Sequence, residues 1–112
     1  MSLRDQIIGA DDLPYEDVDV PEWGCTLRIR GLTAGEAEKF GAELGEQSGG
    51  FEGVRARLLV RSVLDPESGL HVFEDGDLEV LGAKSSQVVM RLFETAQRLS
   101  GLGDSVDVEA GN

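Results

Sequence analysis

The segment from Val20 to Glu36 joins an alternating strand to a complete helix start, and no other part of the chain constrains the fold as strongly. Apolar and polar side chains alternate from residue 23 to residue 30, which is the period of a half-buried strand. The apolar parity is formed by Trp23, Cys25, Leu27 and Ile29. Thr33 and Glu36 then have the spacing of a capping box, in which each side chain accepts the backbone N–H of the other. We therefore expect a strand followed by a helix that begins after Thr33.

The segment from Glu16 to Val20 predicts an earlier strand, because its valines fall on one face and its aspartates on the other. Antiparallel pairing with Cys25–Arg30, around a turn at residues 21–24, would place the outward aspartates opposite Arg28 and Arg30. Such cross-strand pairs contribute about 0.2 to 1 kcal/mol each, which favours one register. A β-hairpin is therefore expected.

Helical spacing and start or stop signals predict the remaining elements. The expected helices cover Ser2–Gly9, Ala34–Gln47, Val54–Leu64, Asp75–Leu81 and a final helix that Ser85 or Ser86 caps and Gly101 stops. On the final helix, Glu94 and Arg98 have the i, i+4 spacing of an outward ion pair. Leu70–Phe73 is expected to form a short strand or an extended link.

These elements predict an α+β fold, in which a small antiparallel β-hairpin or sheet packs against a bundle of about three to four helices. With 112 residues and 40% hydrophobic content, the chain suits one modest core. We expect a flexible N-terminal segment at residues 1–15, a single α+β domain at residues 16–102 and a disordered acidic tail at residues 103–112.

The charge of the chain bears on the class of its partners. Ten basic and 22 acidic residues leave a formal charge of −12, which repels phosphate backbones and anionic membrane surfaces. We therefore expect neither nucleic acid nor a membrane as a partner. No apolar run approaches the roughly 20 residues that span a bilayer, and the single cysteine excludes an internal disulfide. A cytoplasmic protein is expected.

Catalysis would require a nucleophile beside a base, and Cys25 with His71 is the sole combination of thiol and imidazole. Cys25 lies on the apolar parity of its strand, where a thiol behaves as a small buried hydrophobe. His71 stands next to a turn, and no motif flanks either residue. We expect a protein that is not an enzyme.

Asp75, Asp77 and Glu79 have the spacing that begins a calcium loop, but Val80 stands where the EF-hand requires glycine. Capping and first-turn acids at a helix N-terminus explain these residues more simply. No metal is expected.

Gly49, Gly50 and Gly53 precede the most apolar segment of the chain. A phosphate loop would require a lysine followed by serine or threonine, which is missing here. A hinge between helices is the better interpretation, and no cofactor is expected.

Arg55, Arg57 and Arg61 form a basic group in this acidic chain, and the last two lie one helical turn apart. They could bind an acidic partner. Alternatively, they are the solvated edge of a core helix whose charge neighbouring acids balance. We retain the three arginines as interface candidates.

The order of the segments resembles the tail assembly chaperones of long-tailed, siphovirus-type bacteriophages. The similarity covers residues 16–102 and rests on the succession of segments, since no single segment is a strict motif. After the acidic strand, the segments are Pro-Glu-Trp-Gly, Leu-Arg-Ile-Arg-Gly-Leu-Thr, Arg-Ala-Arg-Leu-Leu-Val, Val-Phe-Glu-Asp-Gly-Asp-Leu-Glu-Val-Leu-Gly-Ala-Lys-Ser and Arg-Leu-Phe-Glu-Thr-Ala-Gln-Arg-Leu-Ser-Gly-Leu.

The resemblance implies a non-catalytic protein that binds the tape measure protein, keeps it soluble and assists tail tube assembly. It also implies a homo-oligomer in the cytoplasm of the bacterial host that is not part of the mature virion. The tail tube protein would be recruited through a longer product of programmed frameshifting. We expect the apolar surfaces of the two main helices and the nearby arginines to contact a partner, with Arg55, Arg57, Arg61, Leu58, Val89 and Phe93 as candidates.

A different class remains open from the residues themselves. A small acidic regulator or inhibitor that binds a basic protein partner would share the same charge. Clustering of the acids on one continuous surface, with salt-sensitive binding, would favour that alternative.

Overall fold

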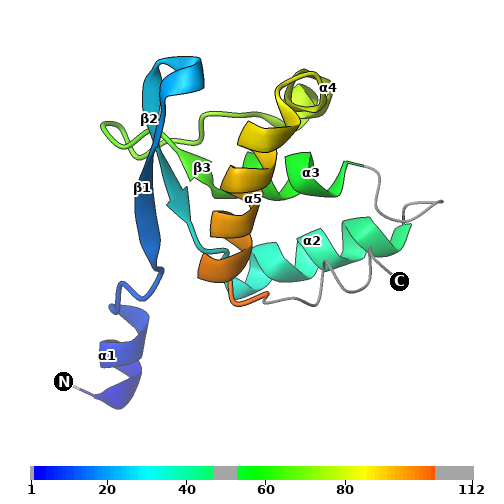
Figure 1. The fold of residues 1–112 in the computed structure, drawn as a ribbon. Helices are drawn as coiled ribbons and strands as arrows, with labels where there is room; N and C mark the ends of the chain where they lie inside the picture. Colours follow the sequence, from blue (N-terminus) through cyan, green and yellow to red (C-terminus); the bar gives the residue numbers. More distant parts are fainter. Residues whose placement is uncertain (1, 47–52, 103–112) are drawn as a thin grey trace.

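An antiparallel hairpin is formed by β1 (Tyr15–Val20) and β2 (Cys25–Arg30), which the short helix η1 (Pro21–Trp23) joins (Figure 1). The computed structural model describes residues 2–46 and 53–102. Asp17 lies opposite Arg28 and Asp19 opposite Thr26, and each pair is joined by a side-chain hydrogen bond of 2.8 Å. Gly24 closes the turn with a φ of 69°, a left-handed conformation that glycine adopts without strain. The predicted hairpin and the pairing of an aspartate with Arg28 are therefore confirmed. The expected aspartate opposite Arg30 is wrong, because the register places Tyr15 there.

A third strand, β3 (Val63–Leu64), pairs antiparallel with β2 and completes the sheet in the order β1-β2-β3. The prediction of a helix as far as Leu64 is wrong for its last two residues, because the helix ends at Ser62 and Val63 is extended. Both strand residues are buried. The Val63 N–H donates to the Leu59 carbonyl at the end of α3, and the Val63 carbonyl accepts the N–H of Val72 at 3.2 Å, so its buried backbone groups are paired. Of the predicted strand at Leu70–Phe73, His71 forms a single bridge to Leu64.

The helices largely follow the predicted ranges. They are α1 (Leu3–Ile8), α2 (Ala34–Glu46), α3 (Val54–Ser62), α4 (Leu78–Gly82), which follows the 3₁₀ turn η2 (Asp75–Asp77), and α5 (Ser86–Leu99). The capping box before α2 is confirmed by reciprocal hydrogen bonds of 2.9 and 3.1 Å between Thr33 and Glu36. The expected cap at Asp75 is wrong, because Glu74 and Asp77 form a capping box one residue earlier.

The end of α5 has the predicted Schellman geometry. Gly101 has a φ of 71°, and its N–H donates to the carbonyl of Arg98. The N–H of Leu102 donates to the carbonyl of Gln97 at 3.1 Å, which satisfies a second free carbonyl of the last turn.

Two salt bridges join α5 to the hairpin. Arg91 pairs with Glu22 and Arg98 with Glu16, each at 3.0 Å. The predicted pair between Glu94 and Arg98 is therefore wrong. Tertiary folding brings Glu16 within reach of the guanidinium, and this contact replaces the local pair along the helix.

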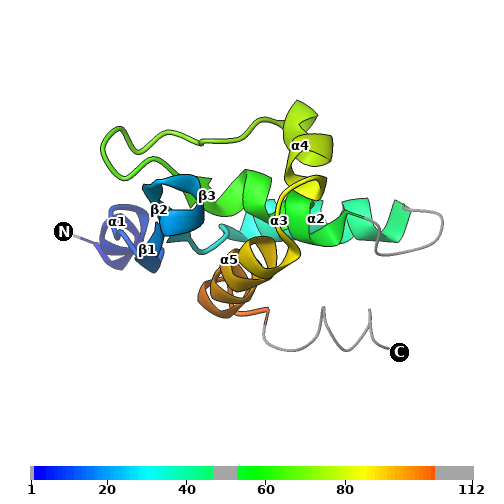
Figure 2. The same ribbon diagram turned by 45° about the horizontal axis from the view of Figure 1, so that its top comes forward.

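The hydrophobic core lies where the sheet, α3 and α5 meet, and α2 and α4 each contribute one of its large side chains (Figures 1 and 2). Trp23 belongs to η1 and not to the strand, and it packs against this core from the hairpin turn. The largest fully buried side chains are Phe40, Phe93, Ile29, Leu58, Leu59, Leu81 and Leu92. The predicted α+β fold, with an antiparallel sheet against helices, is confirmed.

Helix α1 projects from the end of β1 that lies away from the hairpin turn (Figure 1), and none of its residues is buried. Ser2 caps it as predicted, accepting the N–H of Asp5 at 3.1 Å. The expected hinge at Gly49 and Gly50 and the expected acidic tail at residues 103–112 lie outside the described residues. Within the described ranges, no helix is long and apolar enough to cross a membrane.

Candidate functional site

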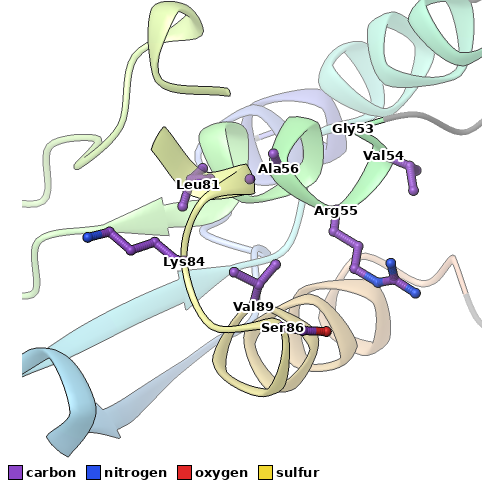
Figure 3. Close-up of a pocket in the computed structure, with 9 residues that line it drawn as sticks. Gly53, Val54, Arg55, Ala56, Leu81, Lys84, Ser86 and Val89 are labelled. Carbon is purple, nitrogen blue, oxygen red and sulfur yellow. The ribbon is translucent and has the colours of Figure 1, made fainter. Parts of the chain in front are cut away.

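A surface cleft of ≈ 220 Å³ lies between the start of α3, the end of α4 and the start of α5 (Figure 3). Its apolar lining comes from all three helices and consists of the buried residues Val54, Ala56, Leu81 and Val89. Arg55 and Lys84 extend from different sides of the cleft, Arg55 from α3 and Lys84 from the link between α4 and α5. The cleft therefore combines an apolar floor with two cationic side chains.

Within residues 2–46 and 53–102, no salt bridge neutralises the two cations of this cleft. Six of the ten basic residues form salt bridges with acids of the same chain. Among the residues that the structure describes, the four basic residues outside these pairs are Arg4, Lys39, Arg55 and Lys84. Two of the four line one cleft, so a protein of net charge −12 presents a local positive potential there.

Two helix N-termini lie beside the same cleft. Neither Gly53 before α3 nor Ser85 before α5 provides a side-chain cap, as far as the described residues go. The first N–H groups of a helix carry partial positive charge, so these ends add to the potential of Arg55 and Lys84.

Six residues are candidates for partner binding from the sequence. In the structure they lie in three regions, which are the cleft, the core and the side of α3 that faces α2. Arg55 and Val89 line the cleft. Leu58 and Phe93 are 0% and 1% exposed and belong to the core between α3 and α5. The Arg55 guanidinium lies 5.7 Å from the centre of the Phe93 ring, which is a cation–π contact. Phe93 therefore helps to position Arg55 at the cleft. A direct partner contact of Leu58 or Phe93 stays a prediction, and in the described fold both side chains are covered.

Arg57 and Arg61 lie on another side of α3, in contact with α2. Arg61 Nη1 is 2.8 Å from Glu43 Oε1, and Arg57 Nη1 is 3.9 Å from Glu43 Oε2. These half-buried side chains correspond to the alternative in which neighbouring acids balance the arginines. Arg57 and Arg61 therefore pair with an acid of the same domain, whereas Arg55 forms no salt bridge with any residue that the structure describes.

Lys84 and Leu81 are site residues that the sequence analysis missed. Lys84 is an isolated base between two helices, and its sequence context contains no basic cluster. Only the fold brings it to the cleft that Arg55 also lines.

The residues considered for catalysis do not form a common site. Cys25 and His71 are both exposed and line different clefts. The prediction of a buried Cys25 is wrong. This residue begins β2 next to the hairpin turn, where the strand is exposed, and burial on the apolar parity begins only at Leu27.

Asp77, the middle residue of the acidic group Asp75, Asp77 and Glu79 that was considered for calcium, has a structural role. Asp77 accepts the Glu74 N–H at 2.8 Å, as a capping residue. Across residues 2–46 and 53–102, no group of three or more potential ligands is arranged to hold a metal ion.

One solved structure similar to this chain is that of the bacteriophage HK97 tail assembly chaperone. The TM-score is 0.63 at 20% sequence identity, and the match covers 86% of this chain and 91% of that chain. No family model matches the sequence, and no curated protein matches it significantly. The chain therefore has the fold of a bacteriophage tail assembly chaperone, the fold that the order of its sequence segments implied.

Proposed function

We propose that this protein is a phage tail assembly chaperone that binds the tape measure protein, keeps it soluble and assists tail tube assembly. The observation that carries the proposal is the similarity in fold to the HK97 chaperone, which extends over 86% of the chain. The order of segments in the sequence supports the same assignment independently.

The cleft between α3, α4 and α5 is the proposed client-binding site. Its floor accepts apolar side chains, and Arg55 and Lys84 can pair with carboxylates on either side of an inserted side chain. The matching client segment is an amphipathic helix whose apolar residues are flanked by acidic ones. The net charge of −12 would help to keep a complex with an aggregation-prone client in solution.

The other parts of the proposal follow from the same assignment. The protein acts by binding and not by catalysis, in the cytoplasm of the bacterial host, and it does not enter the mature virion. It forms homo-oligomers along the client. The tail tube protein is recruited through a longer, frameshifted product.

The alternative of an acidic inhibitor receives less support from the structure. Glu16, Asp17 and Glu22 belong to the most acidic part of the chain, and each forms a salt bridge with an arginine of the same molecule. These contacts reduce the negative field that a charge mimic would present.

Co-expression with the tape measure protein of the same phage tests the proposal. We expect a soluble complex that co-elutes in size-exclusion chromatography, whereas the client expressed alone is insoluble. An insoluble client and no recovered complex would refute the proposed function.

A charge reversal at the cleft tests the site separately. The double variant Arg55→Glu, Lys84→Glu should recover roughly tenfold less complex, because it replaces two attractions by two repulsions. Lys39→Glu is the matched control, since Lys39 is also exposed and unpaired among the described residues but lies on α2. If the double variant binds as well as Lys39→Glu, the client binds elsewhere although the function stands.

A further inference from the structure

We propose that α1 is a docking element that inserts into a cleft beside the hairpin turn of a second copy of this chain. The inference rests on the homo-oligomer of the proposed function and assigns the contact between its copies. It uses surfaces that the proposed client site does not use, so its failure is distinguishable from a failure of client binding.

Helix α1 presents an apolar face that its own domain leaves uncovered. Leu3, Ile7 and Ile8 are 71%, 66% and 64% exposed, and they are three of the largest apolar side chains exposed in the described fold. Leu3 and Ile7 lie one turn apart, as do Arg4 and Ile8, so the four side chains form one continuous face. A helix of six residues is marginal in water unless it packs against something. A partner surface would supply that packing.

The proposed receptor is a cleft of ≈ 620 Å³ beside the hairpin turn. Its apolar lining includes Leu27, Pro66 and Val72, and Asp65 and Glu67 add two carboxylates. Val72 is 42% exposed although it is a large aliphatic residue, so this cleft also has apolar surface that the domain leaves uncovered.

The charges of the two surfaces are complementary. Arg4 forms no salt bridge within the described part of its own chain, and neither do Asp65 and Glu67. Insertion of Leu3 and Ile7 would bring Arg4 toward these carboxylates. The cleft at Arg55 and Lys84 would instead repel Arg4, which makes it the poorer receptor.

The geometry favours a contact between two copies over one within a single chain. Helix α1 precedes β1, whereas the cleft includes Gly24 and Cys25, which follow the other end of that strand (Figure 1). A six-residue strand separates the two surfaces by about 20 Å. Donor and receptor are different patches at opposite ends of the hairpin, so the contact is heterologous. Repetition of such a contact produces a ring if the rotation closes and a helical filament if it does not.

Disulfide cross-linking tests the contact, because Cys25 is the single cysteine of the chain and lines the proposed receptor. In the variant Ile7→Cys, mild oxidation should link residue 7 of one copy to Cys25 of the next. Each copy then carries a donor and a receptor thiol, so a ladder of dimers, trimers and larger species is expected on a non-reducing gel. Peptide mapping should recover the 7–25 linkage.

Two controls define the outcome of the cross-linking. Adding Cys25→Ser to Ile7→Cys should limit the products to dimers, since one thiol per copy remains. Lys39→Cys, an exposed position on α2, should give no ladder with Cys25. If the 7–25 linkage is missing, or is no more abundant than a 39–25 linkage, the proposal is wrong.

Sedimentation equilibrium of variants without added cysteines gives a second measurement. Ile7→Asp should weaken self-association roughly tenfold or more, because it places a charge where an apolar side chain is buried. Gln6→Asp adds the same charge off the apolar face of α1 and should leave association unchanged. Helix α1 contributes no buried residue, so neither variant should unfold the domain. A wild-type protein that stays at the monomer mass of 12.0 kDa at every concentration would overturn the inference.

Discussion

Arg30 and Glu36 form a bidentate pair in which Nη1 donates to Oε1 at 3.1 Å and Nη2 donates to Oε2 at 3.0 Å. Glu36 Oε1 also accepts the N–H of Thr33 as half of the capping box of α2. Arg30 Nη2 additionally donates to the carbonyl of Arg61 near the end of α3. One carboxylate therefore connects β2, α2 and, through Arg30, α3. Its side chain is 26% exposed and that of Arg30 is 16% exposed, so water competes only partly for these bonds.

Truncation of Glu36 should separate its two roles. Glu36→Ala removes both the cap and the partner of Arg30, and we expect it to lower the free energy of unfolding by about 1 to 3 kcal/mol. Glu36→Gln can retain the capping box and loses the charge, so its loss should be smaller. Urea denaturation measures both, with Glu38→Ala on an exposed part of α2 as the control. Equal stability of Glu36→Ala and Glu38→Ala would contradict this role.

Acid should destabilise the fold through carboxylates that are ionised in salt bridges. The hydrogen bonds from Arg28 lower the pKa of Asp17, and those from Arg91 lower the pKa of Glu22. Burial would raise the pKa of Glu36, but the hydrogen bonds from Arg30 and Thr33 outweigh it and the pKa is lowered. A lowered pKa in the folded state means that the ionised form contributes stability above the unfolded pKa, about 4. That contribution is lost as the pH falls through the folded values.

The expected result is a melting temperature that is nearly constant from pH 6 to about 5 and decreases as the pH is lowered through about 4 and below. Circular dichroism measures it, and Glu36→Gln should show a shallower decrease because one of the three linked carboxylates is gone. A wild-type melting temperature that is constant over this range would exclude the linkage.

Local spacing in the sequence is sufficient to predict the hairpin and the start of α2. The hairpin, with an aspartate opposite Arg28, and the box of Thr33 with Glu36 depend on residues close in the chain, and both are confirmed. The aspartate expected opposite Arg30 is not, since Tyr15 lies there. Val63 and Leu64 were assigned to a helix instead, because their strand conformation depends on β2, which lies more than 30 residues earlier.

The candidate site shows the same limit. Arg55 and Val89 could be proposed from the sequence, because they lie in helices with clear apolar patterns. Lys84 could not, since its approach to the cleft follows from the packing of α4 and α5 against α3. The burial of Leu58 and Phe93 was likewise ambiguous, because an apolar helix face looks the same whether its own domain or a partner covers it.

Two glycines should respond to alanine in opposite directions. A methyl group on Gly31 would lie 2.5 Å from the carbonyl oxygen of Leu99, so β2 and the end of α5 must separate to admit it. We expect Gly31→Ala to lower the free energy of unfolding by about 1 to 3 kcal/mol. Gly41 lies inside α2, where such a methyl group would meet no described atom within 4 Å apart from its chain neighbours and the backbone of its own helix. Gly41→Ala should therefore stabilise the protein by about 0.5 to 1 kcal/mol.

Thermal and urea unfolding of the two variants checks this prediction, and each variant is the control for the other because the chemical change is identical. Similar stability of Gly31→Ala and Gly41→Ala would show that the contact between Gly31 and Leu99 is not tightly packed.

The thiol of Cys25 should react readily in the folded protein. The structure places it at the start of β2 on an exposed cleft, and the thiol contributes nothing to the hydrophobic core. We expect one equivalent of a chromogenic disulfide reagent to react under native conditions, and Cys25→Ser to change the free energy of unfolding by less than about 0.5 kcal/mol. Reaction should slow at high protein concentration if α1 of another copy fills the cleft, and Ile7→Asp should abolish this slowing. A thiol that reacts only after denaturation would instead place Cys25 inside the fold, as its parity in the strand first indicated.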